Sequence, residues 1–326
     1  MIGRILLLGA NGQLGWEAQR ALSCLGEVVS YDYPQVDFTN LKSLASLVNQ
    51  IAPRIIFNAA AYTAVDRAEN EPDLAYTINA AAPAVLAEYA RTYRALLVHF
   101  STDYIFDGQQ SANSQTFSQA SKPNIEEKNA PPQLEDVNEG LRTHTGYIES
   151  DYPSPLNVYG QTKLAGEQAI QQIGGLFFIF RTSWVYSLNR GGFVSKVLEW
   201  ARQKPVLRIV SDQISSPTAA RFLAEISAGV LFQSRGDLDW MAERAGVYHL
   251  AGDGAASRFD WARAILENDP RRFEQTVRQV EPALTSEFPS PARRPLFSAL
   301  NCERFISTFG LRLPAWQTAL RLILQT

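Results

Sequence analysis

The chain has 326 residues, of which 46% are hydrophobic and 19% are charged, and its formal net charge is −3. These values exclude a disordered chain and predict one large or two moderate globular domains. The lack of a basic excess argues against a nucleic-acid-binding protein. Two cysteines exclude a disulfide framework, and no run of about 18 uncharged apolar residues is present to span a membrane. We therefore expect a cytoplasmic protein with reduced thiols.

Strands and helices alternate along most of the chain. The predicted strands are short apolar runs, which indicates burial on both faces of a parallel sheet. We therefore predict an α/β fold, with a Rossmann-type doubly wound parallel sheet over residues 1–190. A smaller C-terminal α/β lobe over residues 191–326 would bind the substrate, with segments that cross back to the first domain. The expected strands are residues 5–8, 27–31, 54–58, 95–100, 176–180 and 247–250, and the expected helices are residues 16–24, 41–51, 75–92, 159–173, 193–203, 220–232, 259–268 and 316 onward.

A polar insert at about residues 108–152 interrupts the first domain. It is rich in Gln, Ser, Asn, Pro and Glu and loses apolar periodicity, apart from a weak helical pattern at 134–141. This composition predicts a long surface loop that contributes little to the core, with Phe117 and Tyr147 as loose anchors. The loop would emerge near the helix that follows it, either as a lid, as an assembly element or as a tolerated insertion.

A glycine-rich turn follows the first predicted strand and opens a helix. Gly9, Gly12 and Gly15 have the G-x-x-G-x-x-G spacing, which lets a pyrophosphate approach the backbone at a helix N-terminus. An acidic residue about 20 positions further on is expected to bind the adenosine ribose, and Asp32 stands at the end of the second predicted strand. The alternative interpretation is a structural turn followed by an ordinary turn aspartate.

A tyrosine and a lysine share one face of the helix that begins near residue 159. Tyr159 and Lys163 are four positions apart, so their side chains project together. An ammonium group beside a tyrosine favours the tyrosinate, which suits proton transfer to or from a carbonyl oxygen. The pair alone is a weak signal, because it also occurs as a solvated helix pair. Residues 58–63 and 101–104 follow two other strands, and ligands bind at the carboxyl ends of strands in such sheets.

Together these motifs resemble one known family. The chain is similar over nearly its whole length to the dTDP-4-dehydrorhamnose reductases, within the extended short-chain dehydrogenases/reductases. The blocks at 58–69, 101–108 and 155–167 are specific to this group and its close relatives. The matching segments are G-A-N-G-Q-L-G-W-E at 9–17, N-A-A-A-Y-T-A-V-D-R-A-E at 58–69, S-T-D-Y-I-F-D-G at 101–108, P-L-N-V-Y-G-Q-T-K-L-A-G-E at 155–167, R-T-S-W-V-Y at 181–186, S-S-P-T at 215–218 and R-R-P at 293–295.

The resemblance implies roles for individual residues. Tyr159 would donate the proton, Lys163 would assist it and bind the cofactor ribose, and Thr102 would orient the substrate ketone. Trp184 would offer a flat platform for a sugar ring, with a core tryptophan as the alternative, and Arg294 would contact the diphosphate, with an ordinary surface arginine as the alternative. The implied substrate-binding residues are Thr102, Asp103, Trp184 and Arg294. The residues implied to bind NADH or NADPH are Gly9, Gly12, Gln13, Leu14, Asp32, Asp37, Phe38, Ala61, Tyr62, Thr63, Tyr159 and Lys163.

The resemblance also implies a reaction. It is the reduction of the 4-keto group of dTDP-4-dehydro-β-L-rhamnose to dTDP-β-L-rhamnose, in nucleotide-sugar supply for surface polysaccharide. Two alternatives stay open. One is a non-catalytic protein like the regulatory subunit of methionine adenosyltransferase, which shares the fold and serves as a binding partner. The other is a reductase or epimerase of a different nucleotide sugar.

Two features depart from the family pattern. Family members connect the blocks at 101–108 and 155–167 by a shorter loop than this chain has. Some relatives also form dimers bridged by a divalent metal, and Glu17 fits the first ligand position. Arg221 and the C-terminus occupy the other expected positions, and the three histidines are scattered. We therefore predict no metal site and either a monomer or a homodimer.

Overall fold

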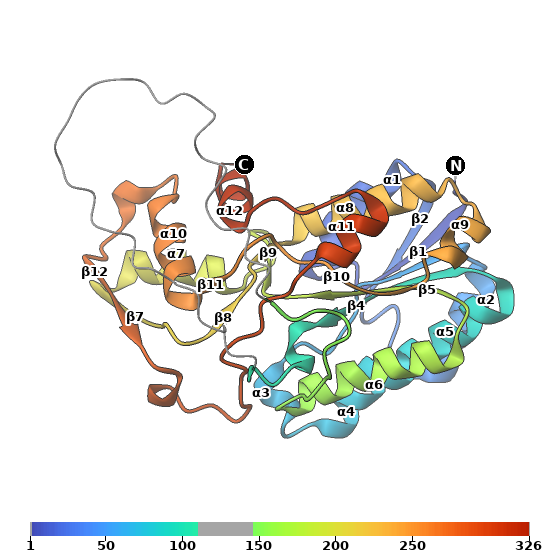
Figure 1. Cartoon of the computed structure of the whole chain (residues 1–326), viewed down its shortest axis with the longest axis horizontal. Coiled ribbons are helices and arrows are strands. Elements are labelled where there is room, and N and C mark those ends of the chain that lie inside the picture. Colours follow the sequence, from blue (N-terminus) through green and yellow to red (C-terminus); the bar gives the residue numbers. More distant parts are fainter. Residues whose placement is uncertain (1, 110–145, 326) are drawn as a thin grey trace.

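A computed structural model describes residues 2–109 and 146–325 of the chain. The larger part is a six-stranded sheet with helices on both faces, and a smaller lobe lies beside it (Figure 1). The strand order is β10-β5-β4-β3-β1-β2, and every neighbouring pair is parallel. The predicted Rossmann-type α/β fold is thereby confirmed. The strands are β1 (Arg4–Leu8), β2 (Glu27–Tyr31), β3 (Ile55–Asn58), β4 (Leu96–Thr102), β5 (Leu176–Thr182) and β10 (Gly246–His249).

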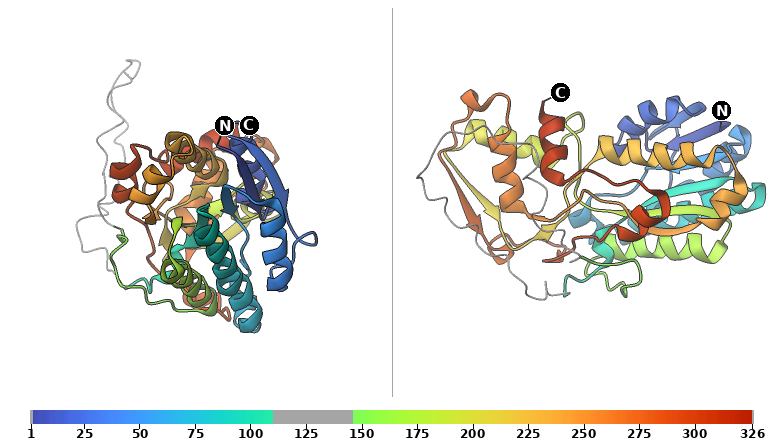
Figure 2. Two further views of the ribbon diagram at one scale, coloured as in Figure 1. Left: turned by 90° about the vertical axis from the view of Figure 1, so that its right-hand side faces the viewer. Right: turned by 45° about the horizontal axis from the view of Figure 1, so that its top comes forward.

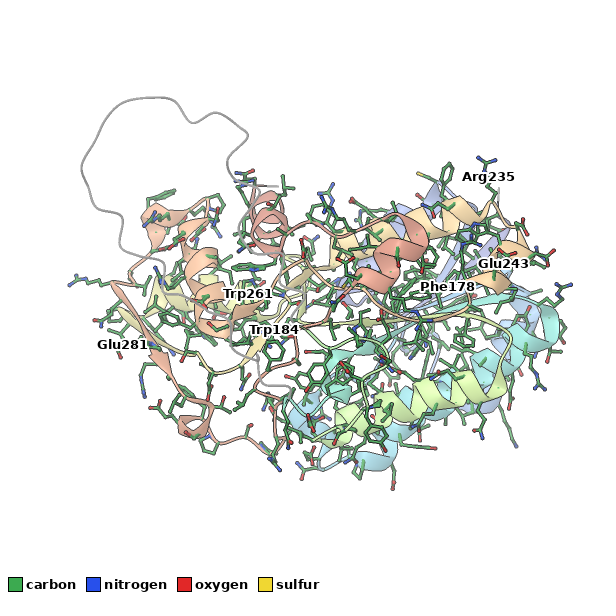
Figure 3. The ribbon with its side chains drawn as sticks, in the orientation of Figure 1. Phe178, Trp184, Arg235, Glu243, Trp261 and Glu281 are labelled. Atoms are coloured by element: carbon green, nitrogen blue, oxygen red, sulfur yellow. The ribbon has the colours of Figure 1, made fainter. Side chains whose placement is uncertain are left out.

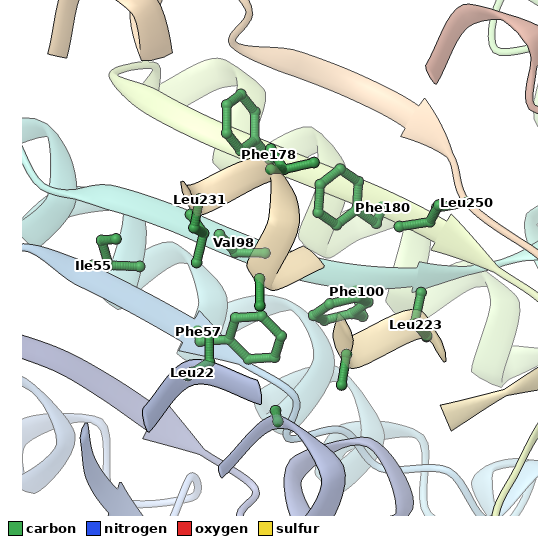
Figure 4. Close-up of a cluster of buried hydrophobic side chains, with 14 of the residues drawn as sticks. Leu22, Ile55, Phe57, Val98, Phe100, Phe178, Phe180, Leu223, Leu231 and Leu250 are labelled. Carbon is green, nitrogen blue, oxygen red and sulfur yellow. The ribbon is translucent and has the colours of Figure 1, made fainter. Parts of the chain in front are cut away.

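The apolar strands supply two cores, one on each face of the sheet. Successive side chains of a strand point to opposite faces, so Ile5 and Leu7 enter one core while Leu6 and Leu8 enter the other. Figure 4 shows the first core, in which Phe57, Phe100 and Phe180 pack under helices. Helices α1 (Gln13–Ser23), α8 (Ala220–Ser234), α9 (Leu238–Glu243) and α11 (Glu303–Phe309) cover this first core, and α2 (Leu41–Ile51), α5 (Ala82–Tyr93) and α6 (Val158–Ile173) cover the second.

The smaller lobe has its own apolar core, built around Trp261 and Tyr186. Further views show it beside the carboxyl-terminal edge of the sheet (Figure 2). Although β10 and α8 come late in the chain, they belong to the main sheet, because β10 pairs with β5 and α8 packs on α1. The elements of the lobe and its connections are α7 (Phe193–Gln203), α10 (Arg258–Glu267), α12 (Trp316–Leu324), β6 (Val185–Tyr186), β7 (Val206–Val210), β8 (Ile214–Ser215), β9 (Thr218–Ala219), β11 (Ala256–Ser257), β12 (Gln279–Ala283), η3 (Arg272–Glu274) and η4 (Thr285–Glu287).

The helix predicted over residues 75–92 is wrong at its start and in its continuity. The segment is divided into α4 (Pro72–Tyr76), a π-helical turn η1 (Thr77–Ala81) and α5, preceded by the short α3 (Val65–Ala68). The alanine-rich pattern is the same in α and π turns, so it did not reveal the change. The π turn places Asn79 against α6, where a Cβ on Gly166 would lie 2.1 Å from the Asn79 carbonyl oxygen.

The polar insert lies partly outside the described residues, and Phe117 and the helix expected at 134–141 are in that part. Among its described residues, Tyr147 belongs to the core. Tyr147 is buried and stacks on Phe106 with ring centroids 4.1 Å apart. The Tyr147 hydroxyl accepts a hydrogen bond from the Gly108 N–H at 3.0 Å, and its backbone bridges to Leu300. The expectation of a loose surface anchor is therefore wrong for Tyr147.

Candidate active site

The glycine turn fits a close approach of ligand and backbone. Gly9 has φ of +79°, and a Cβ there would lie 2.6 Å from the Ala60 nitrogen. A Cβ on Gly15 would lie 2.0 Å from the Gly9 oxygen, so this glycine lets α1 start directly against the strand end. The N-cap residue Gly12 has no side chain to satisfy the first N–H groups of α1, which leaves them available to an anion.

Asp32 stands at the end of β2, beside that turn. Its carboxylate oxygens accept hydrogen bonds from the backbone N–H groups of Asn11, at 2.6 Å, and Tyr33, at 2.7 Å. Each oxygen keeps a lone pair for a further donor, such as a ribose hydroxyl. Asp37 and Phe38 lie away from the cleft. Hydrogen bonds from Thr39 occupy Asp37 and lower its pKa, and Phe38 is buried in the second core.

The loop after β3 forms the next wall. Ala61 and Thr63 line the cleft, whereas the Tyr62 hydroxyl is hydrogen bonded to the Glu71 carboxylate outside it. Asn79, in the π turn, accepts from the Tyr62 N–H at 2.9 Å and donates to the Tyr62 carbonyl at 3.1 Å. The sequence analysis missed Asn79, since only the π turn brings its side chain to this loop.

Tyr159 opens α6, directly against the end of β4. The N-cap residue Asn157 accepts from the Gly160 N–H at 2.8 Å, and Gly160 packs on the Tyr104 carbonyl so closely that a Cβ would lie 2.2 Å away. This contact places the Tyr159 ring 5.9 Å from that of Tyr104. Burial raises the pKa of Tyr159, and a hydrogen bond with Thr102 opposes that shift. The phenol is therefore protonated at neutral pH.

Lys163 is buried one turn further along α6. Its ammonium group donates to the Phe100 carbonyl at 2.6 Å and lies 3.2 Å from His99 Nε2. Burial lowers the pKa of Lys163 to about 8, against the opposing attraction of Glu167. The lysine is thus turned toward the end of β4, and it loses its proton at a lower pH than an exposed lysine does.

His99 is a further residue that the sequence analysis did not assign to the site. Asn58 accepts from the Ala60 N–H with its oxygen, so its amide nitrogen faces His99 Nδ1, at 3.0 Å. Burial, together with Lys163, lowers the pKa of His99 well below its usual value, so the ring is neutral. The ring thus lies between Asn58, which faces Nδ1, and Lys163, which faces Nε2.

Asp103 is buried at the edge of the cleft, where it connects the end of β4 to segments from the second half of the chain. Its buried carboxylate accepts from the hydroxyl groups of Ser298 at 2.6 Å, Ser215 at 2.9 Å, Ser183 at 3.2 Å and Thr102 at 3.2 Å. Burial raises its pKa and these hydrogen bonds oppose the shift. Ser215 and Ser298 come from the second half of the chain, so Asp103 fastens that half to the end of β4. Its predicted contact with a sugar nucleotide remains a prediction.

Trp184 lines the cleft and packs against the core of the smaller lobe, whereas Arg294 does not line the cleft. Trp184 stacks on Trp261 with ring centroids 5.5 Å apart, and Figure 3 shows the two side by side. Arg294 is not an ordinary surface arginine, because it donates to the Asp66 carboxylate at 2.7 Å and to the Ser290 hydroxyl at 2.6 Å. It links the C-terminal segment to α3.

A cleft of about 690 Å³ brings most of the predicted residues together at the carboxyl ends of β1, β3, β4 and β5. Ser101 and Thr182, to which the sequence analysis gave no role, also line it, and their buried hydroxyl groups have no hydrogen-bond partner among the described residues. Such orphaned groups fit a ligand that supplies the missing partners. Of the predicted residues, those lining the cleft are Gly9, Gly12, Gln13, Leu14, Asp32, Ala61, Thr63, Thr102, Asp103, Tyr159, Lys163 and Trp184; Asp37, Phe38, Tyr62 and Arg294 do not.

Neither a metal centre nor a membrane span emerges from the described residues. Between residues 2–109 and 146–325, no group of three or more His, Cys, Asp or Glu side chains is placed to hold a metal ion. In the same ranges, no helix is long and apolar enough to cross a membrane.

Fold and site together define a Rossmann-type oxidoreductase with a dinucleotide cleft at the switch point of a parallel sheet. The family model described as the RmlD substrate binding domain matches residues 3–326, and the chain belongs to that family, the dTDP-4-dehydrorhamnose reductases. The chain is 36% identical over 325 residues to the dTDP-4-dehydrorhamnose reductase of Escherichia coli K12, covering 98% of this chain and 96% of the relative.

Solved structures agree with this assignment. The dTDP-4-dehydrorhamnose reductase of Clostridium acetobutylicum has a TM-score of 0.80 and 30% identity, covering 99% of this chain and 98% of that one. The Bacillus anthracis dTDP-4-dehydrorhamnose reductase, solved in complex with NADP, has the same TM-score and identity, covering 99% of each chain. The resemblance found in the motifs is thereby confirmed.

Proposed function

We propose that the protein reduces the 4-keto group of dTDP-4-dehydro-β-L-rhamnose to give dTDP-β-L-rhamnose, with NADH or NADPH as cofactor. The observation that carries the proposal is that Tyr159 and Thr102 line the same cleft as the glycine turn. The relatives' names supply the substrate. A role in sugar supply for surface polysaccharide, a cytoplasmic location and a monomeric or homodimeric state belong to the same proposal.

The geometry accounts for each part of this reaction. When bound, the reduced nicotinamide supplies a hydride to C4 of the sugar. Thr102 orients the carbonyl oxygen, and the Tyr159 phenol gives that oxygen its proton, so that the ketone becomes an alcohol. Burial favours this direction, because it keeps Tyr159 in the protonated form that a donor requires. Lys163 and Asp32 would hold the two riboses of the dinucleotide, and the N-terminus of α1 its pyrophosphate.

The direct test is turnover of the 4-keto sugar nucleotide by the purified full-length protein. We expect one reduced dinucleotide to be consumed for each dTDP-rhamnose formed, as measured by dinucleotide fluorescence and chromatography of the product. Formation of an isomer without net consumption of cofactor would instead identify an epimerase. Dinucleotide binding without any conversion of this or other keto sugar nucleotides would support the non-catalytic alternative.

Asp32 predicts the cofactor preference. A carboxylate at the adenosine ribose accepts hydroxyl hydrogen bonds and repels a 2′-phosphate, so kcat/KM with NADH should equal or exceed that with NADPH. Asp32→Asn should shift the ratio toward NADPH by about tenfold, since one charge interaction is removed. Asp37→Asn is the matched control, because Asp37 lies outside the cleft, and its ratio should not change. A strong NADPH preference of the unaltered protein would contradict the assignment.

Lys163 predicts a pH dependence of cofactor binding. A lysine is charged below its pKa, so with a pKa of about 8 it loses its positive charge as the pH rises through that value. Dinucleotide affinity should therefore be constant at lower pH and fall above about pH 8, as measured by fluorescence titration. Lys163→Arg keeps its charge throughout this range and should bind with little pH dependence. An unchanged affinity of the unaltered protein up to about pH 10 would exclude this role for Lys163.

A further inference from the structure

Arg258, the first residue of α10, has no ion-pair partner within residues 2–109 and 146–325. Its guanidinium carbon lies 3.6 Å from the ring centroid of Trp184, 4.9 Å from that of Phe193 and 5.4 Å from that of Trp261. Within the described residues it forms no ion pair, and burial lowers its pKa to about 10. Aromatic faces compensate a desolvated cation only in part, and such groups are normally paired with an anion.

The surroundings of Arg258 connect it to the catalytic residues. Burial raises the pKa of Tyr104, and the nearby charges of Arg258 and Arg294 oppose that shift. The ring of Tyr104 packs edge-on against that of Tyr159. Arg294 is neutralised by Asp66. The carboxylate of Asp103 attracts Arg258 from a distance, but four hydroxyl groups already occupy it. In the described part of the chain, a positive charge without an ion-pair partner therefore lies beside Tyr104, whose ring contacts that of Tyr159.

We infer that Arg258 binds the diphosphate of the nucleotide-sugar substrate. This inference rests on the proposed function, because it takes the sugar to be placed with C4 at Tyr159. C1 and C4 lie on opposite sides of a pyranose ring, so the sugar ring separates the diphosphate on C1 from Tyr159. The ring of Tyr104 likewise separates Arg258 from Tyr159. Trp184 borders both the cleft and Arg258, so that a sugar on its face would direct the diphosphate toward the guanidinium. The planar fork of arginine suits bidentate binding of phosphate oxygens.

Two alternatives fit less well: the dinucleotide as the ligand of Arg258, and Arg294 as the main contact of the substrate diphosphate. The dinucleotide pyrophosphate is expected at the N-terminus of α1, where Gly12 and the orphan N–H groups lie. Arg294 was the diphosphate contact implied by the sequence, but its charge is committed to Asp66 and its other nitrogen to Ser290. The main contact with the diphosphate is therefore assigned to Arg258 instead of Arg294.

The test measures binding of dTDP, of thymidine and of NADPH by calorimetry to the full-length protein and to Arg258→Gln. Loss of a charge-assisted hydrogen bond should weaken dTDP binding at least about tenfold. Thymidine and NADPH binding should not change, and KM for the sugar nucleotide should rise more than kcat falls. Arg263→Gln, on the exposed side of the same helix, is the matched control and should leave all values unchanged.

The outcomes separate the inference from the proposed function. Equal dTDP affinity in Arg258→Gln, or an equal loss for thymidine and NADPH, would overturn the inference. If the unaltered protein binds dTDP in an Arg258-dependent way but does not reduce the 4-keto sugar, the proposed function fails and the subsite stands. If Arg258→Gln is unstable, Arg258→Lys serves instead: it keeps the charge but not the fork, and a selective loss of dTDP affinity is again expected.

Discussion

Replacing Tyr159 by phenylalanine is expected to lower kcat by about 10²–10⁴-fold, the usual contribution of a positioned proton donor. The substitution removes one hydroxyl group and keeps the ring that packs on Tyr104. Because we propose that the glycine turn, Asp32 and Lys163 bind the dinucleotide, its dissociation constant should stay within about twofold, a change well under 1 kcal/mol. The measurement pairs single-turnover kinetics with a fluorescence titration of the reduced cofactor.

The control for this variant is Tyr186→Phe. Tyr186 is also buried in the core of the smaller lobe, but its hydroxyl group has no hydrogen-bond partner in the part of the chain that the structure describes. Removing that hydroxyl should leave kcat unchanged and cost no stability. Turnover by Tyr159→Phe at close to the wild-type rate would show that another group delivers the proton, and the assignment of Tyr159 would have to be abandoned.

Much of the fold could be predicted because its signals are local. The apolar runs of β1 and β3, the glycines between strand and helix, and the four-residue spacing of Tyr159 and Lys163 are each contained in a few consecutive residues. Their convergence follows from one general rule, that ligands bind at the carboxyl ends of parallel strands. The roles of individual residues came from the family resemblance, and most of the residues that it implied line the cleft.

The residues that escaped prediction depend on contacts between distant segments. Ser298 reaches Asp103 across 195 positions of the chain, and Asn79 reaches the loop after β3 only through a π turn. Arg258 has no partner in its own helix that would mark it. Conversely, Asp37 and Phe38 follow Asp32 closely in sequence, but the chain turns away after β2. Both residues therefore lie outside the cleft.

The helix that carries Tyr159 and Lys163 is fixed to the sheet by a buried ion pair. Arg181, on β5, donates to both carboxylate oxygens of Glu167, on α6, with its shortest contact at 2.7 Å. The side chains are 5% and 0% exposed, so water screens neither charge. Glu167 follows Lys163 by four residues and Tyr159 by eight, on the same face of α6. The pair therefore sets how far α6 lies from the sheet at the active site.

Glu167→Gln should consequently destabilise the protein by about 3–5 kcal/mol, because it leaves Arg181 charged, buried and without a counter-ion. Replacing both residues, as Glu167→Leu with Arg181→Met, should recover part of this loss, since two apolar side chains of similar volume leave no charge to compensate. Chemical denaturation measures the free energies of unfolding, and the control is Glu225→Gln, which breaks the exposed pair with Arg221 and should cost less than about 1 kcal/mol. A double variant no more stable than Glu167→Gln would show that packing around Arg181, rather than its charge, holds α6 against the sheet.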